Sequence, residues 1–208
     1  MKKISLFFTL AMMVFATSFV ACEDEQINPN NNDDPQNNGD ENANYQMYSF
    51  NETLNYNSTK ATNASAFCAS TRQAVPATNS SADFCVGTQN QYGTFVCSPN
   101  ASLLAQCYDA NGITYKNTKS TKIKNLGYVD IQDYYDVNTL DQMSVSADYL
   151  DGKSSLGVGV NQLSSGQVIA FQTADGCKGV AKMSFSKVTK TVSVSGYVAV
   201  PKNSAGVK

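Results

Sequence analysis

The last third of the chain alternates between apolar and polar residues in a way that strongly favours β-strands. Thr191 to Val200 places a valine or glycine at every second position against Ser and Tyr, the pattern of a half-buried strand. Gly166 to Thr173 is apolar on both faces, and Val180 to Val188 follows it. Asp175-Gly176 lies between these two segments and is typical of a hairpin turn. We therefore predict a three-stranded antiparallel meander.

Earlier parts of the domain carry shorter strand patterns, broken by Gly, Asn, Pro and Ser. We expect strands near Met47 to Leu54, Ala82 to Gly87, Gly93 to Cys97 and Thr121 to Leu126. The fold class that follows is mainly β: an antiparallel β-sandwich-like single domain with one or two short helices. An α+β domain is the alternative.

Two segments between the expected strands have helical patterns. Asn100 is positioned to cap a helix over Ala101 to Tyr108, which Asn111-Gly112 would end. Thr139 is positioned to cap a second helix that reaches about Leu150. Its apolar face would consist of Leu140, Met143, Ala147 and Leu150.

The N-terminus has the composition of an export signal. Lys2 and Lys3 precede the uncharged apolar run Ile4 to Ala21, as in a secretory signal peptide. Ala21-Cys22 resembles the lipobox of bacterial lipoproteins, in which the Cys becomes the lipidated first residue, although Phe19 replaces the usual Leu. The resemblance implies a signal peptide over residues 1–21 and a lipid anchor on Cys22. A retained transmembrane helix and simple secretion are the alternatives.

The residues directly after Cys22 are Glu23, Asp24 and Glu25. This acidic cluster resembles the signal that brings lipoproteins of Bacteroidota-type bacteria to the cell surface. The resemblance implies a lipid-anchored outer-membrane protein that faces the medium. A plainer interpretation is that the three residues begin an acidic tether, and both interpretations can hold together.

Residues 22–44 contain too little apolar surface to fold, so we expect a disordered, Asn-rich acidic tether before a globular domain at 45–208. Seven of the seventeen acidic residues lie in the tether, which leaves ten in the domain against thirteen basic ones. The domain is thus slightly basic. Its basic residues are scattered without a stripe, which argues against nucleic acid as a partner.

The chain contains no His. This excludes Ser-His-Asp and Cys-His nucleophile activation and zinc sites built on His. The domain has a single Glu, Glu52, and nothing in the sequence pairs it with a second carboxylate for glycoside hydrolysis. We therefore expect no enzymatic activity, no catalytic residues, no cofactor and no metal site, and a hydrolase is the third-ranked function.

The domain contains five cysteines, an odd number, without a Cys-x-x-Cys pair. Several lie among apolar residues, where a thiol acts as a small buried hydrophobe. We favour buried free thiols over a disulfide framework, with Cys85–Cys97 as the most plausible single bridge. The five are Cys68, Cys85, Cys97, Cys107 and Cys177.

The segment "YVDIQDYYD" gathers aromatic and acidic side chains that could bind a ligand. Tyrosine rings stack on the C–H faces of sugars, and neighbouring carboxylates bond the hydroxyls. Calcium held by the carboxylates is a second possibility, and a structural loop before a helix, with half-buried tyrosines, is a third. The candidate binding residues are Tyr128, Asp130, Asp133, Tyr134, Tyr135 and Asp136.

The domain as a whole resembles a group of Bacteroidota surface lipoproteins in its motifs "SAFCAS", "SSADFCVG", "YGTFVCSPNAS" and "SSGQVIAFQTADGCKGVAKMSF", followed by "TVSVSGYVAV". The resemblance covers most of 45–200 in outline and implies location and a β-rich fold, but no activity. The leading hypothesis is a noncatalytic binding or adhesion domain, with a glycan or a surface protein as partner and the membrane reached through the anchor. A structural or assembly component of a surface complex is the alternative.

Overall fold

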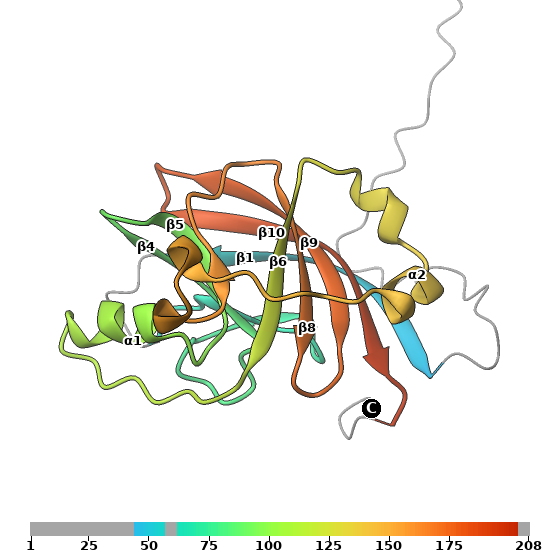
Figure 1. The fold of residues 1–208 in the computed structure, drawn as a ribbon, viewed down its shortest axis with the longest axis horizontal. Coiled ribbons are helices and arrows are strands. Elements are labelled where there is room, and N and C mark those ends of the chain that lie inside the picture. Colours follow the sequence, from blue (N-terminus) through green and yellow to red (C-terminus); the bar gives the residue numbers. More distant parts are fainter. Residues whose placement is uncertain (1–43, 57–61, 204–208) are drawn as a thin grey trace, which may run out of the picture. The chain divides into compact units, whose positions relative to one another are not determined.

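The structure, a computed structural model, describes residues 44–56 and 62–203, all within one compact unit. The expected signal peptide, Cys22 and the acidic cluster at 23–25 lie outside these residues. The described chain forms two antiparallel sheets of five strands, two α-helices and three short 3₁₀ helices (Figure 1). The mainly β, sandwich-like fold class is thus confirmed.

Sheet A contains the C-terminal meander. Its strand order is β1-β10-β9-β8-β6. The bounds are β1 Tyr45–Asn55, β6 Thr121–Gly127, β8 Val168–Thr173, β9 Lys178–Ser186 and β10 Thr191–Pro201. The predicted hairpin at Asp175-Gly176 joins β8 to β9, and Gly176 has the positive φ of 87° that such a turn requires. The predicted meander is therefore confirmed, and β1 extends the sheet beside β10.

Sheet B is built from shorter strands in the order β3-β2-β4-β5-β7. The bounds are β2 Ala66–Cys68, β3 Gln73–Val75, β4 Phe84–Gln89, β5 Gly93–Cys97 and β7 Gly159–Val160. The predicted strands near 82–87 and 93–97 correspond to β4 and β5. The sequence patterns did not indicate β2, β3 or β7, which have only two or three residues each.

The main core lies between the two sheets and contains four phenylalanines, each of which contacts at least one of the others. Phe67 of β2 lies 4.4 Å from Phe50 of β1 and 5.1 Å from Phe84 of β4, measured between ring centroids. Phe84 in turn lies 5.3 Å from Phe171 of β8. Burying each such ring stabilises the fold by about 1.5–3 kcal/mol, so these contacts across the sheets fix their separation and orientation.

The outer face of each sheet is covered as well. Helix α1 (Ser102–Asp109) packs Leu103, Leu104 and Tyr108 onto sheet B, and helix α2 (Val137–Gln142) packs Leu140 onto sheet A. Strand β8 therefore has two buried faces, which explains why its sequence is apolar throughout.

The first predicted helix is correct within one residue at each end, but its predicted cap is wrong. Ala101 occupies the N-cap position without a side-chain hydrogen bond. The Asn100 side chain instead accepts a hydrogen bond from Ser98 Oγ at 2.7 Å, inside the loop that follows β5. Because the Asn100 side chain is engaged by Ser98, it does not cap the helix that begins two residues later.

The second predicted helix is wrong in both position and length. Asp136, rather than Thr139, caps α2, because its Oδ1 accepts from the Asn138 N–H at 2.7 Å. The helix stops at Gln142, and Met143 is already extended. The Asp148 N–H donates to the Ile123 carbonyl, so the chain beyond Met143 returns to the edge of sheet A. The helical spacing of apolar residues beyond Gln142 therefore does not produce a longer helix. Leu150 instead begins the separate 3₁₀ helix η2 (Leu150–Gly152).

Gly179 provides a test of how tightly the core is packed. It lies directly opposite Phe171 in the β8–β9 pair, and an added Cβ would collide with the Phe171 ring and lie 2.7 Å from the Tyr197 carbonyl oxygen. We expect Gly179→Ala to lower the free energy of unfolding by about 1–3 kcal/mol, because the ring must leave its place in the core. Urea denaturation would measure the change. Ser184→Ala, at an exposed position of the same strand, is the control and should change stability by less than about 0.5 kcal/mol.

Candidate functional site

The aromatic and acidic segment singled out in the sequence connects β6 to α2 over the outer face of sheet A. Its middle forms the 3₁₀ helix η1 (Ile131–Tyr134). Asp130 caps η1 through a 3.0 Å bond from the Gln132 N–H, and Asp136 caps α2. Two of the three candidate carboxylates therefore hold the segment's own backbone, which is the structural role that the third interpretation expected.

The three tyrosines of this segment lie in different environments. Tyr134 packs against the apolar residues between η1, α2 and sheet A. Tyr128 and Tyr135 are 70% and 66% exposed, which makes them two of the most exposed large apolar side chains in the described residues. Asp133 is exposed on η1. The segment thus offers two tyrosine rings and one carboxylate to solvent, while its other candidate residues support it.

Calcium gains no support from this geometry. Within residues 44–56 and 62–203, no group of three or more His, Cys, Asp or Glu side chains is arranged to hold a metal ion.

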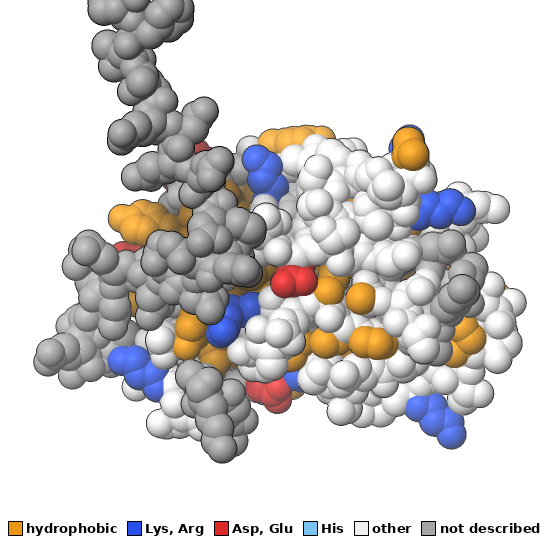
Figure 2. Space-filling view, turned by 180° about the vertical axis from the view of Figure 1, so that it is seen from behind, with side chains coloured by type: hydrophobic (Ala, Val, Ile, Leu, Met, Phe, Trp, Pro, Cys, Tyr) orange, Lys and Arg blue, Asp and Glu red, His pale blue; other side chains and the backbone are white. Residues whose placement is uncertain are grey.

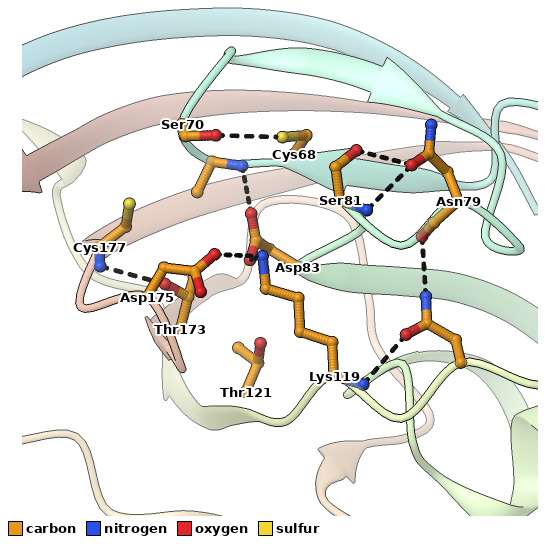
Figure 3. A network of polar contacts seen from close by, with 12 residues as sticks. Cys68, Ser70, Asn79, Ser81, Asp83, Lys119, Thr121, Thr173, Asp175 and Cys177 are labelled. Carbon is orange, nitrogen blue, oxygen red and sulfur yellow. Dashed lines mark hydrogen bonds and ion pairs between the residues drawn. The ribbon is translucent and has the colours of Figure 1, made fainter. Parts of the chain in front are cut away.

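The strongest polar arrangement lies elsewhere, at one end of the space between the sheets (Figure 3). Lys119 Nζ lies 2.7 Å from Asp83 Oδ1 and 2.5 Å from Asp175 Oδ2, so one ammonium group bridges two carboxylates. The Ala69 N–H donates to Asp83 Oδ2 at 2.7 Å. We call Asp83, Lys119 and Asp175 the bridging triad.

Each member of the triad comes from a different connection. Asp83 directly precedes β4 of sheet B, and Lys119 lies just before β6 of sheet A. Asp175 belongs to the β8–β9 turn. The triad therefore joins the two sheets by charge where their aromatic core ends.

Hydrogen bonds to its backbone N–H and carbonyl hold Lys119 in position. Its N–H donates to Asn117 Oδ1 at 3.0 Å, and its carbonyl accepts from the Asn100 N–H at 3.2 Å. The Asn117 side chain in turn donates to the carbonyls of Ala77 and Asn79. The loop that carries Lys119 is thus tied to the loops of sheet B on both sides.

Burial distinguishes the two carboxylates. The Asp83 side chain is 2% exposed, whereas that of Asp175 is 59% exposed. Burial raises the pKa of Asp83, although the bonds from Lys119 and Ala69 act in the opposite direction. Burial acts to lower the pKa of Lys119, but its hydrogen bonds to Asp175 and Asp83 outweigh this and raise it. Asp83 and Lys119 therefore both hold a proton more tightly than the free side chains do.

Two cysteines lie near Asp83. Burial acts to raise the pKa of Cys68, but hydrogen bonds from Ser70 and Thr71 outweigh it and lower that pKa. Burial and the negative charge of Asp83 raise the pKa of Cys177 to about 11. Both thiols are buried, so neither offers a ready nucleophile to solvent.

The other three thiols lie between α1 and the outer face of sheet B, where Cys107 belongs to the helix and Cys85 and Cys97 belong to the sheet. Cys85 and Cys97 are directly opposite each other in the β4–β5 pair, and burial raises the pKa of Cys85 to about 12. All five domain cysteines are free and buried, which confirms the preferred interpretation over a disulfide framework. The register that made Cys85–Cys97 the most plausible bridge is nevertheless present.

The bridging triad was not predicted from the sequence. Its one local signal is Asp83, a charged residue at the start of the otherwise apolar strand "FCVG", because a buried carboxylate requires a partner. That partner is 36 residues away, and no spacing rule points to it. Asp175 was recognised only as a turn residue.

Comparison with known proteins gives no match to a protein-family model, to a curated protein or to a solved structure. Function must therefore be argued from the residues themselves.

The ion pair makes stability depend on Lys119. We expect Lys119→Met to lower the free energy of unfolding at neutral pH by about 3–5 kcal/mol, because Asp83 would remain buried without a cation. Thermal denaturation at several pH values would measure it. Without Lys119 the pKa of Asp83 in the folded state rises further above its unfolded value, so the deficit should shrink as the pH falls towards about 4.

Lys153→Met is the matched control. Lys153 pairs with Asp151 at 2.9 Å at an exposed position, where solvent screens the two charges, so this substitution should change stability little. An equal loss of stability in both variants, or a deficit in Lys119→Met that does not change with pH, would contradict the role given to the buried pair.

Proposed function

We propose that the protein is a lipid-anchored surface protein whose β domain is a noncatalytic binding module for glycans. The observation that carries this proposal is the pair of exposed rings at Tyr128 and Tyr135, on a segment fixed by two capping carboxylates and packed onto sheet A. Exposed tyrosines offer large contact area with few rotatable bonds, and their hydroxyls can bond to sugar hydroxyls.

Further contacts hold this segment against the rest of the domain. The Tyr197 hydroxyl on β10 donates to Gln132 Oε1 at 2.9 Å, which ties η1 to the sheet. Gly166 lies beneath Tyr128, where an added Cβ would be 3.5 Å from the ring. A binding surface that is already ordered loses little conformational entropy when a ligand binds.

The carboxylates of the described domain favour binding over hydrolysis. Glycoside hydrolysis needs one protonated acid and one ionised carboxylate that both reach the scissile bond. Asp83 and Asp175 come together, but Lys119 Nζ lies between them and Asp83 is buried. Asp130 and Asp136 cap helices.

The anchor and the surface charge complete the proposal. The lipobox-like Ala21-Cys22 and the acidic residues after it support a lipid-anchored protein that faces the medium from the outer membrane. Within the described residues, none of the helices has the length and apolar character needed to cross a membrane. On the face in Figure 2, Lys and Arg side chains lie apart from one another without a basic stripe.

The tyrosines can be tested directly. We expect Tyr128→Ala and Tyr135→Ala each to weaken binding of a glycan selected on an array by about 3- to 10-fold, because each removes one stacking face. Calorimetry with the selected glycan would measure the dissociation constants. Tyr149→Ala, which removes a 46% exposed tyrosine outside this segment, is the matched control and should bind normally.

Two results would count against the glycan module. One is the absence of saturable binding to any glycan on the array, and the other is equal weakening by all three tyrosine variants. Recovery of the protein from gently solubilised membranes only in a stable complex would instead favour a structural or assembly component.

The anchor can be tested separately. We expect Cys22→Ser to move the protein from the membrane fraction to the soluble fraction, because a serine cannot carry the thioether-linked lipid. Immunoblotting of fractionated cells would measure this. Ser18→Ala, within the apolar run, is the control and should leave the protein in the membrane. Membrane retention of Cys22→Ser would mean that the apolar run itself is the anchor.

A further inference from the structure

The bridging triad has the parts of an amide-forming site as well as those of an ion pair. Lys119 Nζ, a potential nucleophile, lies 2.7 Å from one oxygen of the Asp83 carboxyl. The other oxygen accepts the Ala69 N–H at 2.7 Å, as the carbonyl oxygen of a reacting acyl group does. Asp175 lies 2.5 Å from the same nitrogen and can relay protons. We propose that Lys119 and Asp83 condense within the folded protein to an amide that joins the two sheets covalently.

The reaction balances without a co-reactant. The bond from Lys119 Nζ to Asp83 Cγ forms, and the bond from Cγ to Oδ1 breaks. Two of the three ammonium protons leave with Oδ1 as one water molecule, and the third stays on the amide nitrogen. Asp175 takes a proton from the ammonium, passes it to the departing oxygen and ends as it began. No electrons are transferred.

The surroundings favour the product. Asp83 lies between Ala82 and Phe84, both fully buried, and its own side chain is 2% exposed. A neutral amide costs less to bury than two separate charges, and low access of water opposes hydrolysis. Burial also raises the pKa of Asp83, which favours the protonated carboxyl that an amine can attack.

Asp175 supplies a proton acceptor, which a simple lysine–aspartate ion pair lacks. Because the two carboxylates raise the pKa of Lys119, the amine must pass a proton to a neighbour before it can attack. Asp175 Oδ2 lies 2.5 Å from that nitrogen and its side chain is 59% exposed, so it is placed both to accept this proton and to exchange it with solvent.

The other lysine–aspartate pairs in the described residues lack this arrangement. Lys124–Asp148, Lys153–Asp151 and Lys178–Asp141 each involve one carboxylate, a third or more exposed, at 2.9–3.4 Å. Geometry therefore assigns the reaction to Lys119 and provides matched controls in the same chain.

A chymotryptic digest of the folded full-length protein tests the proposal. We expect a branched peptide with Asp83 on one arm and Lys119 on the other, lighter than the two separate peptides by the mass of one water molecule. The branch must be located by fragmentation, because Asp175-Gly176 could also lose water by closing a succinimide on its own backbone. A cross-link that includes Lys119 excludes that route.

Two variants test the assigned roles. Lys119→Arg keeps a positive charge but has no primary amine, so it should form no branched peptide. Asp175→Ala should slow formation of the branched peptide by about 100-fold or more. Lys178→Arg, at a pair with one carboxylate, should form the branch normally. Recovery of Asp83 and Lys119 only in separate linear peptides of the folded wild-type protein would overturn the proposal, even if the variants fail to fold. Normal branching in Asp175→Ala would overturn the proton-relay role given to Asp175.

Discussion

The burial of Asp83 constrains the arrangement around it. A carboxylate with 2% of its side chain exposed is stable only if its charge is balanced, and the groups that contact it come from outside β4: Lys119 forms an ion pair with Oδ1 and the Ala69 N–H donates to Oδ2. The backbone of Ala69 follows β2, and Lys119 precedes β6. Asp83 therefore fixes the end of sheet B and the entry to sheet A at one point. Phe84, the next residue, begins the stack of aromatic rings between the sheets, so polar and apolar contacts meet there.

The elements that could be predicted from the sequence are those whose burial follows a local period. β10 was predictable because Val192, Val194 and Val198 face one core at every second position. β2 was not, because three residues show no period, and it is a strand only because β4 and β3 lie on either side of it. For α2 the reverse happened, because a local period was present but the predicted longer helix did not form. The spacing of Leu140 and Met143 was helical, but the chain beyond Met143 was drawn back to β6 by the Asp148–Ile123 backbone bond.

The candidate binding segment was found in the sequence because its residues are consecutive, yet their roles could not be assigned there. Asp130 and Asp133 are equivalent in composition, but one caps η1 and the other faces solvent. Tyr134 and Tyr135 are neighbours, but only the second is largely exposed, because a short helix turns adjacent side chains in different directions. The composition of the segment is enough to locate the candidate surface. The hydrogen bonds that cap η1 and α2 determine which of its side chains face solvent.

A covalent link at Lys119 would suit a module that binds while it is tethered to a membrane. If the proposed anchor and binding surface are both present, force on a bound ligand would pass from the outer face of sheet A through β10 and β1 towards the N-terminal side of Tyr45. Sheet B is held to sheet A by the aromatic core, by the bridging triad and by a few hydrogen bonds, such as that from the Ala74 N–H of β3 to Glu52 Oε2 of β1. An amide between Lys119 and Asp83 would prevent the sheets from separating at the end where the triad lies, even when the core opens. The same residues that make burial of Asp83 possible would then make the association of the sheets irreversible.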